Sequence, residues 1–399
     1  MNASEQALPG IVILGGAHAP LAFARAVARP GLAVWHVTDD NPLVGYSRNI
    51  SRQLTWAGAE QPGALEQLEA MARTHGLGGY LLLAAGDPEV KLIAQNYERL
   101  SGQFRLATLP WEQLVVACDK SQAYRRAGEL GIGFPKVHDL ASLEEARAAG
   151  IQLPAVMKPR MRLGDDPFTA AKAWRVDTHE EFLAAYEKAA GFVGPGNIVV
   201  QELIPGDGAT QFSYTAVWNK GAPVAEFVAL RRRQYPVEFG AGTFVEVVEN
   251  DDVVDVGRRF LSSIAHHGPV EIEFKRDPRD GRLKLIDVNP RLWTWFGLAK
   301  AAGLDYGALV LDIAAGVPRN VSGVPVVGTA WMYLPRDFLA ATQMMFSRPR
   351  AIGLGEYLSS FAKVRSWGVF DPGDLVPALA DIPLGFSRMM AARRKLRKS

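Results

Sequence analysis

Residues 268–295 read GPVEIEFKRDPRDGRLKLIDVNPRLWTW, and this segment carries the most informative pattern in the chain. The segments VEIEF and LKLIDVN each alternate apolar with polar residues, and RDPRDGR between them supplies a proline, an Asp-Gly pair and solvating charges. Such alternation on both sides of a turn signal predicts an antiparallel hairpin. Because successive side chains of a strand point to opposite faces, the hairpin can bring Glu273 beside Asp287 and Asn289.

Carboxylate and amide oxygens gathered in one place suit Mg²⁺, which keeps several waters and shares its other ligand positions with phosphate oxygens. The hairpin therefore predicts a magnesium site on Glu273, Asp287 and Asn289. Arg291, just beyond the asparagine, is placed to hold a phosphoryl group or a substrate carboxylate. The alternative is a solvent-facing hairpin whose acids pair with the lysine and arginine side chains of the same strands.

Length, charge and cysteine content set limits on the whole chain. Its 399 residues are too many for one core, so two or three lobes are expected. A net charge of +2 argues against nucleic acid or an acidic membrane as an obligatory partner. The single cysteine, Cys118, excludes an internal disulfide and fits a reducing cytoplasm. No apolar run approaches the roughly 20 residues of a membrane span, and the basic residues 386–399 are expected to form a solvated helix end.

The chain opens with alternating strands and helices. Residues 11–14 (IVIL) form an apolar strand that ends at Gly15-Gly16, a helical pattern follows, and LAVWHV is a second strand. This order continues to about residue 115 and predicts a parallel sheet with right-handed crossovers. The turn lacks the Gly-x-Gly-x-x-Gly fingerprint, so a nicotinamide-dependent oxidoreductase is a distant alternative.

Further candidate residues lie between this lobe and the hairpin. Asp119 caps a predicted helix that opens with Lys120, and Lys158 ends the predicted strand in LPAVMKPR. The strand in IVVQELIPGDG is broken by a Pro-Gly pair, which leaves the backbone groups of residues 201–206 free to meet a ligand.

Taken in order, Lys120, Lys158, the connector 201–206 and the Asp-Val-Asn-Pro-Arg end of the hairpin resemble the ATP-grasp family over roughly residues 116 to 322. The chain is similar to the carboxylate–amine ligases of that family, in a branch with D-aspartate ligase-like and carbamoyl-phosphate-synthase-like proteins. The family most often has glutamate at the position of Asp287.

The resemblance implies an α/β and α+β fold with three parts. These are an N-terminal Rossmann-like lobe (1–115), an ATP-grasp domain of two α+β subdomains (about 116–203 and 204–322), and a C-terminal extension (323–399).

The resemblance also implies ligands and roles. ATP would be bound with Mg²⁺, for which Mn²⁺ could substitute, on Glu273, Asp287 and Asn289. The nucleotide would lie against a set of side chains and backbone groups along a cleft: Lys120, Lys158, Lys172, Gln201, Glu202, Leu203, Ile204 and Asp207.

Three arginines follow one another at residues 231–233 on a predicted strand. The ordinary interpretation is that all three arginines are exposed to solvent. Alternation along the strand would place Arg231 and Arg233 on one face and Arg232 on the other. The sharper hypothesis is that one or two of them enter the cleft and hold an acidic substrate or the γ-phosphate. We expect Arg233 to be catalytic there, together with Lys158 and Arg291.

The implied reaction joins a small carboxylate to a small amine, with amino acids as candidates for both, through an acyl phosphate with release of ADP and phosphate. Alternatives are a biotin-carboxylase-like or other phosphorylating enzyme, and a nucleotide-binding protein without turnover. The protein is expected in the cytoplasm without nucleic acid or a membrane span, and a homodimer is one assembly that the sequence allows.

Overall fold

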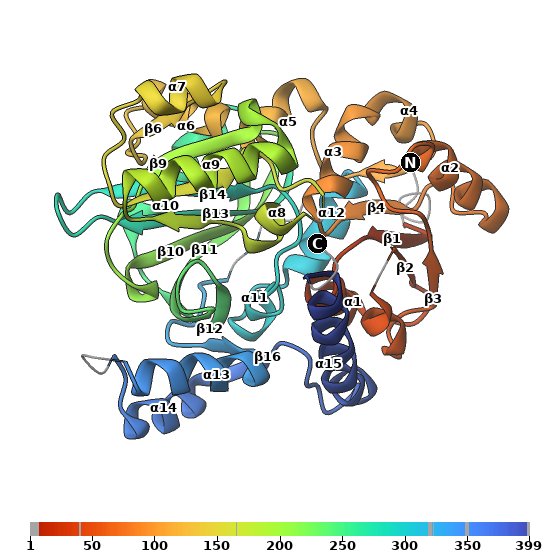
Figure 1. Ribbon diagram of the computed structural model, residues 1–399. Coiled ribbons are helices and arrows are strands. Elements are labelled where there is room, and N and C mark those ends of the chain that lie inside the picture. Colours follow the sequence, from red (N-terminus) through yellow and green to blue (C-terminus); the bar gives the residue numbers. More distant parts are fainter. Residues whose placement is uncertain are drawn as a thin grey trace.

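The computed structural model describes residues 8–39, 41–164, 166–317, 321, 323–347 and 351–396, and Figure 1 shows how the elements are arranged. In this part of the chain there are three sheets: a parallel sheet of five strands, an antiparallel sheet of four and a mixed sheet of seven. The prediction of a parallel-sheet lobe followed by α+β subdomains is confirmed.

The parallel sheet forms the N-terminal lobe, with its strands in the order β3-β2-β1-β4-β5. Its elements are β1 (Gly10–Leu14), α1 (His18–Val27), β2 (Ala33–Thr38), η2 (Pro42–Tyr46), β3 (Arg52–Thr55), α2 (Ala64–His75), β4 (Leu81–Ala84), α3 (Asp87–Gln95), α4 (Tyr97–Ser101) and β5 (Arg105–Leu106). Strand β1 is apolar and buried along its whole length, as is typical of a parallel strand covered on both faces.

A buried carboxylate, Glu89, lies where the strand ends of this lobe meet two glycine turns. Its side chain fills the space that a side chain at Gly15 or Gly86 would need, and Glu89 is only 7% exposed. Burial raises the pKa of Glu89 to about 7, with smaller contributions in the same direction from Asp39 and Asp87. The folded state disfavours the ionised carboxyl of Glu89. The free energy of unfolding therefore falls as the pH rises from 4.5, the ordinary pKa of a glutamate, to about 7, the pKa of Glu89 in the folded protein.

We expect Glu89→Gln to stabilise the protein at pH 8 and to leave its stability nearly unchanged at pH 4. The gain at pH 8 should be about 1–3 kcal/mol, since each unit of pKa shift corresponds to about 1.4 kcal/mol. Urea denaturation at the two pH values measures the difference, with Glu98→Gln on the exposed face of α4 as the control. An equal gain at both pH values would contradict the titration of Glu89.

The four-stranded sheet has the order β6-β9-β7-β8 and follows two linking helices. The elements of this region are α5 (Trp111–Cys118), α6 (Lys120–Glu129), β6 (Val137–Asp139), α7 (Leu143–Ala148), β7 (Ala155–Pro159), α8 (Pro167–Ala171), β8 (Trp174–Val176), α9 (His179–Val193), η3 (Pro195–Asn197) and β9 (Ile198–Glu202). Helix α9 covers the sheet and begins with a capping box formed by Thr178 and Glu181.

The seven-stranded sheet has the order β14-β13-β10-β11-β12-β15-β16. Its strands and accompanying helices are η4 (Gly208–Thr210), β10 (Gln211–Asn219), β11 (Ala222–Tyr235), β12 (Ala241–Val248), α10 (Asp251–Ser262), β13 (Gly268–Arg276), β14 (Leu283–Asn289), α11 (Leu298–Ala301), α12 (Tyr306–Ala314) and β15 (Ala330–Met332). The remaining elements are α13 (Leu334–Met345), α14 (Leu354–Ser360), η5 (Phe361–Lys363), β16 (Val364–Trp367) and α15 (Val376–Leu396).

The predicted hairpin is formed by β13 and β14. Glu273 lies opposite Asp287 and Glu271 lies opposite Asn289 in the register of the two strands. The register shifts after Glu273, which leaves Ile286 as an extra residue on β14. The acidic and amide side chains therefore gather at one end of the hairpin, as the alternation predicts.

Two strands from the region expected to be a separate extension complete the seven-stranded sheet. Strand β15 pairs antiparallel with β12, and β16 pairs parallel with β15. The sheet therefore continues past the boundary predicted at residue 322. Helix α15 lies beside α1 of the N-terminal lobe (Figure 1), and Arg25 Nε donates to Asp374 Oδ2 at 3.0 Å just before that helix. Within the described ranges, none of the helices has the length and apolar content that spanning a bilayer requires.

Candidate functional site

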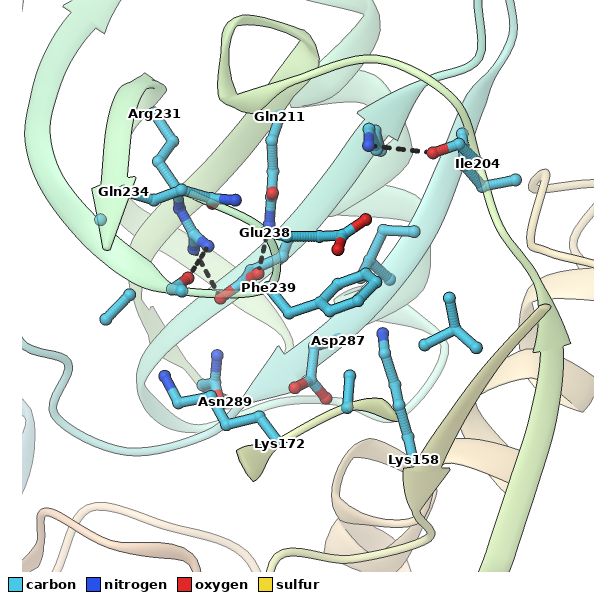
Figure 2. A pocket seen from close by; sticks show the side chains of 18 of the residues that line it. Lys158, Lys172, Ile204, Gln211, Arg231, Gln234, Glu238, Phe239, Asp287 and Asn289 are labelled. Carbon is cyan, nitrogen blue, oxygen red and sulfur yellow. Dashed lines mark hydrogen bonds and ion pairs between the residues drawn. The ribbon is translucent and has the colours of Figure 1, made fainter. Parts of the chain in front are cut away.

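A cavity of about 420 Å³ lies between the four-stranded and seven-stranded sheets (Figure 2). Eleven of the thirteen residues singled out in the sequence line it: Lys120, Lys158, Lys172, Gln201, Leu203, Ile204, Asp207, Glu273, Asp287, Asn289 and Arg291. The two that do not are Glu202 and Arg233. Residues far apart in the sequence thus meet in one place.

The floor of the cavity on the hairpin side is a cluster of oxygen atoms. Its members are Glu273 and Asp287, which lie opposite each other, and Asn289, which lies opposite Glu271. Glu271 was not among the predicted site residues, although the alternation in VEIEF places it on the same face as Glu273. Burial raises the pKa of Glu271 to about 7, and the neighbouring Glu273 carboxylate raises it as well.

Cationic side chains from other elements already pair with this cluster. Lys120 Nζ lies 3.1 Å from Asp287 Oδ1, and Arg231 Nη2 lies 2.8 Å from Glu273 Oε1. Gln211 Nε2 donates to the other Glu273 oxygen at 2.7 Å. Burial would raise the pKa of Glu273, but the Arg231 guanidinium, together with Lys172 and Lys158, outweighs it and the pKa is lowered. Glu273 is therefore held as a carboxylate.

The donor set fits magnesium bound together with a polyphosphate. Among the described residues, no three His, Cys, Asp or Glu side chains gather closely enough to hold a metal ion alone. Glu273, Asp287 and Asn289 offer two carboxylates and one amide to the same cavity. Phosphate oxygens and water would complete the coordination shell, which is how Mg²⁺ is usually bound.

Four lysines line the cavity: Lys120, Lys158, Lys172 and Lys275. Lys120 is held at the start of α6, where Asp119 caps the helix by accepting from the Gln122 N–H. Burial lowers the pKa of Lys158 to about 8, and burial lowers that of Lys172 to about 8 as well. Lys172 ends α8 with φ of 67°. A bound polyanion would stabilise the charged form of each amine.

The loop before α8 is where the family resemblance places a phosphate-covering flap. Gly164 N–H donates to Glu60 Oε2 of the N-terminal lobe at 2.7 Å. Asp166 does not line the cavity, and it caps α8 by accepting from the Phe168 and Thr169 N–H groups. Its neighbour Asp165 lies outside the described residues.

The connector that follows β9 runs along the opposite wall. Gln201 Oε1 accepts from the Tyr124 hydroxyl at 2.9 Å, and the Ile204 carbonyl accepts from Lys275 Nζ at 2.9 Å. The Glu202 side chain points out of the cavity to Arg279 Nη2, 2.8 Å away. The Glu202 N–H also has a partner, the Lys136 carbonyl at 2.9 Å, and Glu202 does not line the cavity.

Asp207 and Leu203 complete this wall. Asp207 is exposed, and its Oδ1 accepts from the Ala209 N–H at 2.9 Å. Leu203 supplies apolar surface to the cavity.

The prediction that Arg233 enters the cleft is wrong. Arg233 forms two bonds of 2.9 Å to the Asp337 carboxylate of α13 and a third of 3.0 Å to Ser360 Oγ. The register of β11 against β12 shifts between Arg231 and Arg233, so regular alternation is lost at this point. Arg231 is the arginine that reaches the cavity, and Arg233 lies among buried residues behind the strand.

Arg291 connects the hairpin to the N-terminal lobe. Its guanidinium bonds to Asp87 Oδ1 at the start of α3, and its Nη2 donates to Asn289 Oδ1 at 2.9 Å. Burial would raise the pKa of Asp87, but Arg291 and Arg162 outweigh it and the pKa is lowered. Asp87 therefore fixes a positive group at the edge of the cavity.

A loop after β11, residues 236–240, lines part of the cavity. Phe239 has φ of 58°, a left-handed conformation that is uncommon outside glycine, and its ring points into the cavity (Figure 2). Glu238 lies 2.7 Å from Arg175 of β8, which ties this loop to the four-stranded sheet. No sequence signal marks a non-glycine residue for this conformation.

No protein-family model matches the chain. The chain is similar to the D-aspartate ligase of Enterococcus faecium (strain Aus0004), with 26% identity over 227 residues that cover 53% of this chain and 53% of that enzyme. It is also similar to the arginine-specific large chain of carbamoyl phosphate synthase from Geobacillus stearothermophilus, with 24% identity over 286 residues, 68% of this chain and 27% of that one. The chain thus spans about half the length of the first relative and about a quarter of the second.

Among solved structures, the chain is similar to an L-amino acid ligase from Bacillus licheniformis. The TM-score is 0.65 and the identity 17%, over 80% of this chain and 79% of that one. At this level of identity the likeness shows a shared fold.

Proposed function

We propose that this chain, which has the ATP-grasp fold, is an ATP-dependent carboxylate–amine ligase. The observation that carries the proposal is the meeting of two groups across one cavity. The oxygen cluster of Glu273, Asp287 and Asn289 lies on one side, and Lys120 and Lys158 come from elements of the facing region. A bound nucleoside triphosphate requires oxygen ligands for its divalent cation and positive groups for its phosphates, and the cavity offers both.

The nucleotide would span the cavity from the connector to the hairpin. Apolar Leu203 and Ile204 would contact the adenine, and Asp207 would accept from a ribose hydroxyl. Among the described residues, the Ile204 N–H donates to no other group, so it is free for the edge of the base. The polyphosphate would extend toward Lys158 and the hairpin, where Mg²⁺ would offset its charge.

The proposed reaction has two steps. A carboxylate oxygen of the first substrate bonds to the γ-phosphorus as the bond to ADP breaks, which gives an acyl phosphate. The amine nitrogen of the second substrate then bonds to the carbonyl carbon, phosphate leaves and the nitrogen loses a proton. Arg291 lies beside the cluster and would hold the carboxylate and the transferred phosphoryl group by paired hydrogen bonds. Loop 236–240 and the segment before α8 would exclude water from the acyl phosphate.

We propose that at least one substrate is an amino acid. Support comes from the likeness to a D-aspartate ligase and to an L-amino acid ligase, whose names state their substrates. We place the enzyme in the cytoplasm, where ATP is supplied, and a homodimer stays a prediction.

Incubation of the protein with ATP, Mg²⁺ and pools of amino acids tests the proposal by the release of ADP and phosphate. Release that requires both a carboxylate and an amine supports the ligase, and Mn²⁺ is expected to replace Mg²⁺. Release with bicarbonate alone would indicate a biotin-carboxylase-like enzyme. Tight ATP binding without release under any pool would indicate a nucleotide-binding protein.

ATP binding is expected to weaken as the pH rises above 8. Burial lowers the pKa of Lys158 and of Lys172 to about 8, so both amines lose charge above that pH in the free protein. Because ATP favours the charged amines, binding takes up protons, and the dissociation constant should rise about tenfold between pH 8 and pH 9.5. Calorimetry in two buffers of different ionisation enthalpy measures the uptake.

Lys158→Arg is the matched control, since arginine stays charged throughout this range. The variant should show a shallower rise in the dissociation constant. If the affinity of the unmodified protein for ATP does not change with pH, Lys158 and Lys172 do not bind the phosphates.

A further inference from the structure

Two helices at the lower edge of the molecule in Figure 1, α13 and α14, carry an exposed apolar surface. The described residues include seventeen large hydrophobic side chains that are exposed, and six of them fall within residues 334–358. We call these six the α13–α14 surface: Leu334, Phe338, Leu339, Phe346, Leu354 and Leu358. Phe346 is 81% exposed and Leu354 is 62% exposed. A cluster of this kind usually marks a binding surface.

The opposite sides of the same helices are packed against the rest of the protein. The six apolar side chains are therefore exposed on helices that are held in place. Asp337 on α13 is fully buried and pairs with Arg233 of the large sheet. Ala340 and Ala341 are buried beside it, and Tyr357 of α14 is buried as well. Both helices therefore have one fixed inner side and one apolar outer side.

The sequence segment that carries this surface contains more basic than acidic residues. Residues 334–365 contain five Lys and Arg and two Asp and Glu, in a chain whose net charge is only +2. Two of these seven charges are paired with residues of the large sheet: Asp337 with Arg233, and Lys363 with Glu246 at 2.6 Å. Arg336 and Arg365 are exposed, and Arg348 and Arg350 follow Phe346 in the sequence but lie outside the described residues. An exposed apolar surface with excess basic residues is complementary to an anionic lipid interface.

We propose that the α13–α14 surface docks the protein on an anionic membrane, with the apolar side chains inserted among the lipid acyl chains near the headgroups. A second copy of the chain is the less suitable occupant, because a two-fold contact would place the same basic segment against itself. The proposal concerns peripheral binding and is independent of the ligase activity, since none of the six residues lines the cavity.

Co-sedimentation of the full chain with vesicles tests this proposal. One set of vesicles is phosphatidylcholine alone, and the other contains about 30% phosphatidylglycerol. We expect binding to the anionic vesicles to be at least about tenfold tighter and to weaken in 1 M salt, because the basic residues contribute through screened attraction.

The variant that removes the apolar contribution is Phe338→Ser/Phe346→Ser/Leu354→Ser. Its binding to anionic vesicles should fall at least about tenfold, since lipid insertion depends on buried apolar area. The matched control is Val324→Ser/Val326→Ser/Phe192→Ser, which changes three exposed apolar side chains elsewhere and should bind as the unmodified protein does. Circular dichroism and ATP binding establish that both variants are folded.

Three results would overturn the proposal. The first is failure of the unmodified protein to bind anionic vesicles, and the second is equal binding to both kinds of vesicle. The third is a dimer in solution that becomes a monomer in the Phe338, Phe346 and Leu354 variant, because the surface would then be the contact between two copies.

Discussion

Replacing Asp287 with alanine is expected to lower the rate of ATP turnover by at least about a thousandfold, because the change removes a carboxylate that would hold Mg²⁺ against the phosphates. Asp287 lies opposite Glu273 and 3.1 Å from Lys120 Nζ, so the same change also releases the lysine from its partner. The carboxylate is 26% exposed, and its loss leaves no buried cavity. We therefore expect Asp287→Ala to remain folded, with a loss of stability that comes from leaving the Lys120 amine, whose side chain is 8% exposed, without its partner.

The measurement is ADP release under saturating ATP, Mg²⁺ and both substrates, together with thermal unfolding. Asp280→Ala is the matched control, since Asp280 lies in the turn of the same hairpin and pairs with Lys284 at 2.9 Å on the exposed side. That control should retain full turnover. An active Asp287→Ala enzyme would mean that the hairpin does not hold the metal.

Replacing Arg233 with alanine is expected to destabilise the folded protein by about 3–5 kcal/mol, because it leaves the Asp337 carboxylate buried and unpaired. The side chains of this pair are 4% and 0% exposed, and Asp337 also accepts from Thr243 Oγ1 at 2.9 Å. The paired change Arg233→Met/Asp337→Leu removes both charges and should restore much of the lost stability.

Urea denaturation measures these losses, and Arg232→Ala is the control on the neighbouring residue. Arg232 pairs with Glu246 but is 41% exposed, so its loss should change stability by less than about 1 kcal/mol. At low temperature, folded Arg233→Ala should still turn over ATP. A variant of full stability without turnover would restore the hypothesis that Arg233 is catalytic.

Local patterns in the sequence predict much of the fold and most of the cavity lining. The hairpin at residues 268–295 can be predicted from two local signals. Alternation of apolar and polar residues indicates which face of the strand each side chain takes, and the Asp-Gly turn indicates where the chain reverses. The same rule predicts that Glu273 and Asp287 share a face. The parallel lobe follows similarly from apolar strands that alternate with helices.

Other features of the site depend on contacts that no local pattern reports. A shift of register in β11 sends Arg231 to the cavity and Arg233 away from it, and such a shift depends on how β12 pairs with the strand. The bond between Arg291 and Asp87 joins residues 204 positions apart. The joining of β15 and β16 to the large sheet likewise requires the edge of β12 to be in place.

Local sequence accounts for the kinds of element, the faces of the hairpin and the chemistry available on them. Long-range packing selects which cation meets which carboxylate, which arginine reaches the cavity and which apolar helix faces stay exposed. The two differ in the distance along the chain over which the interactions act. Backbone periodicity and turn chemistry act over a few neighbouring residues, whereas strand register and ion pairing depend on segments that only the complete fold brings together.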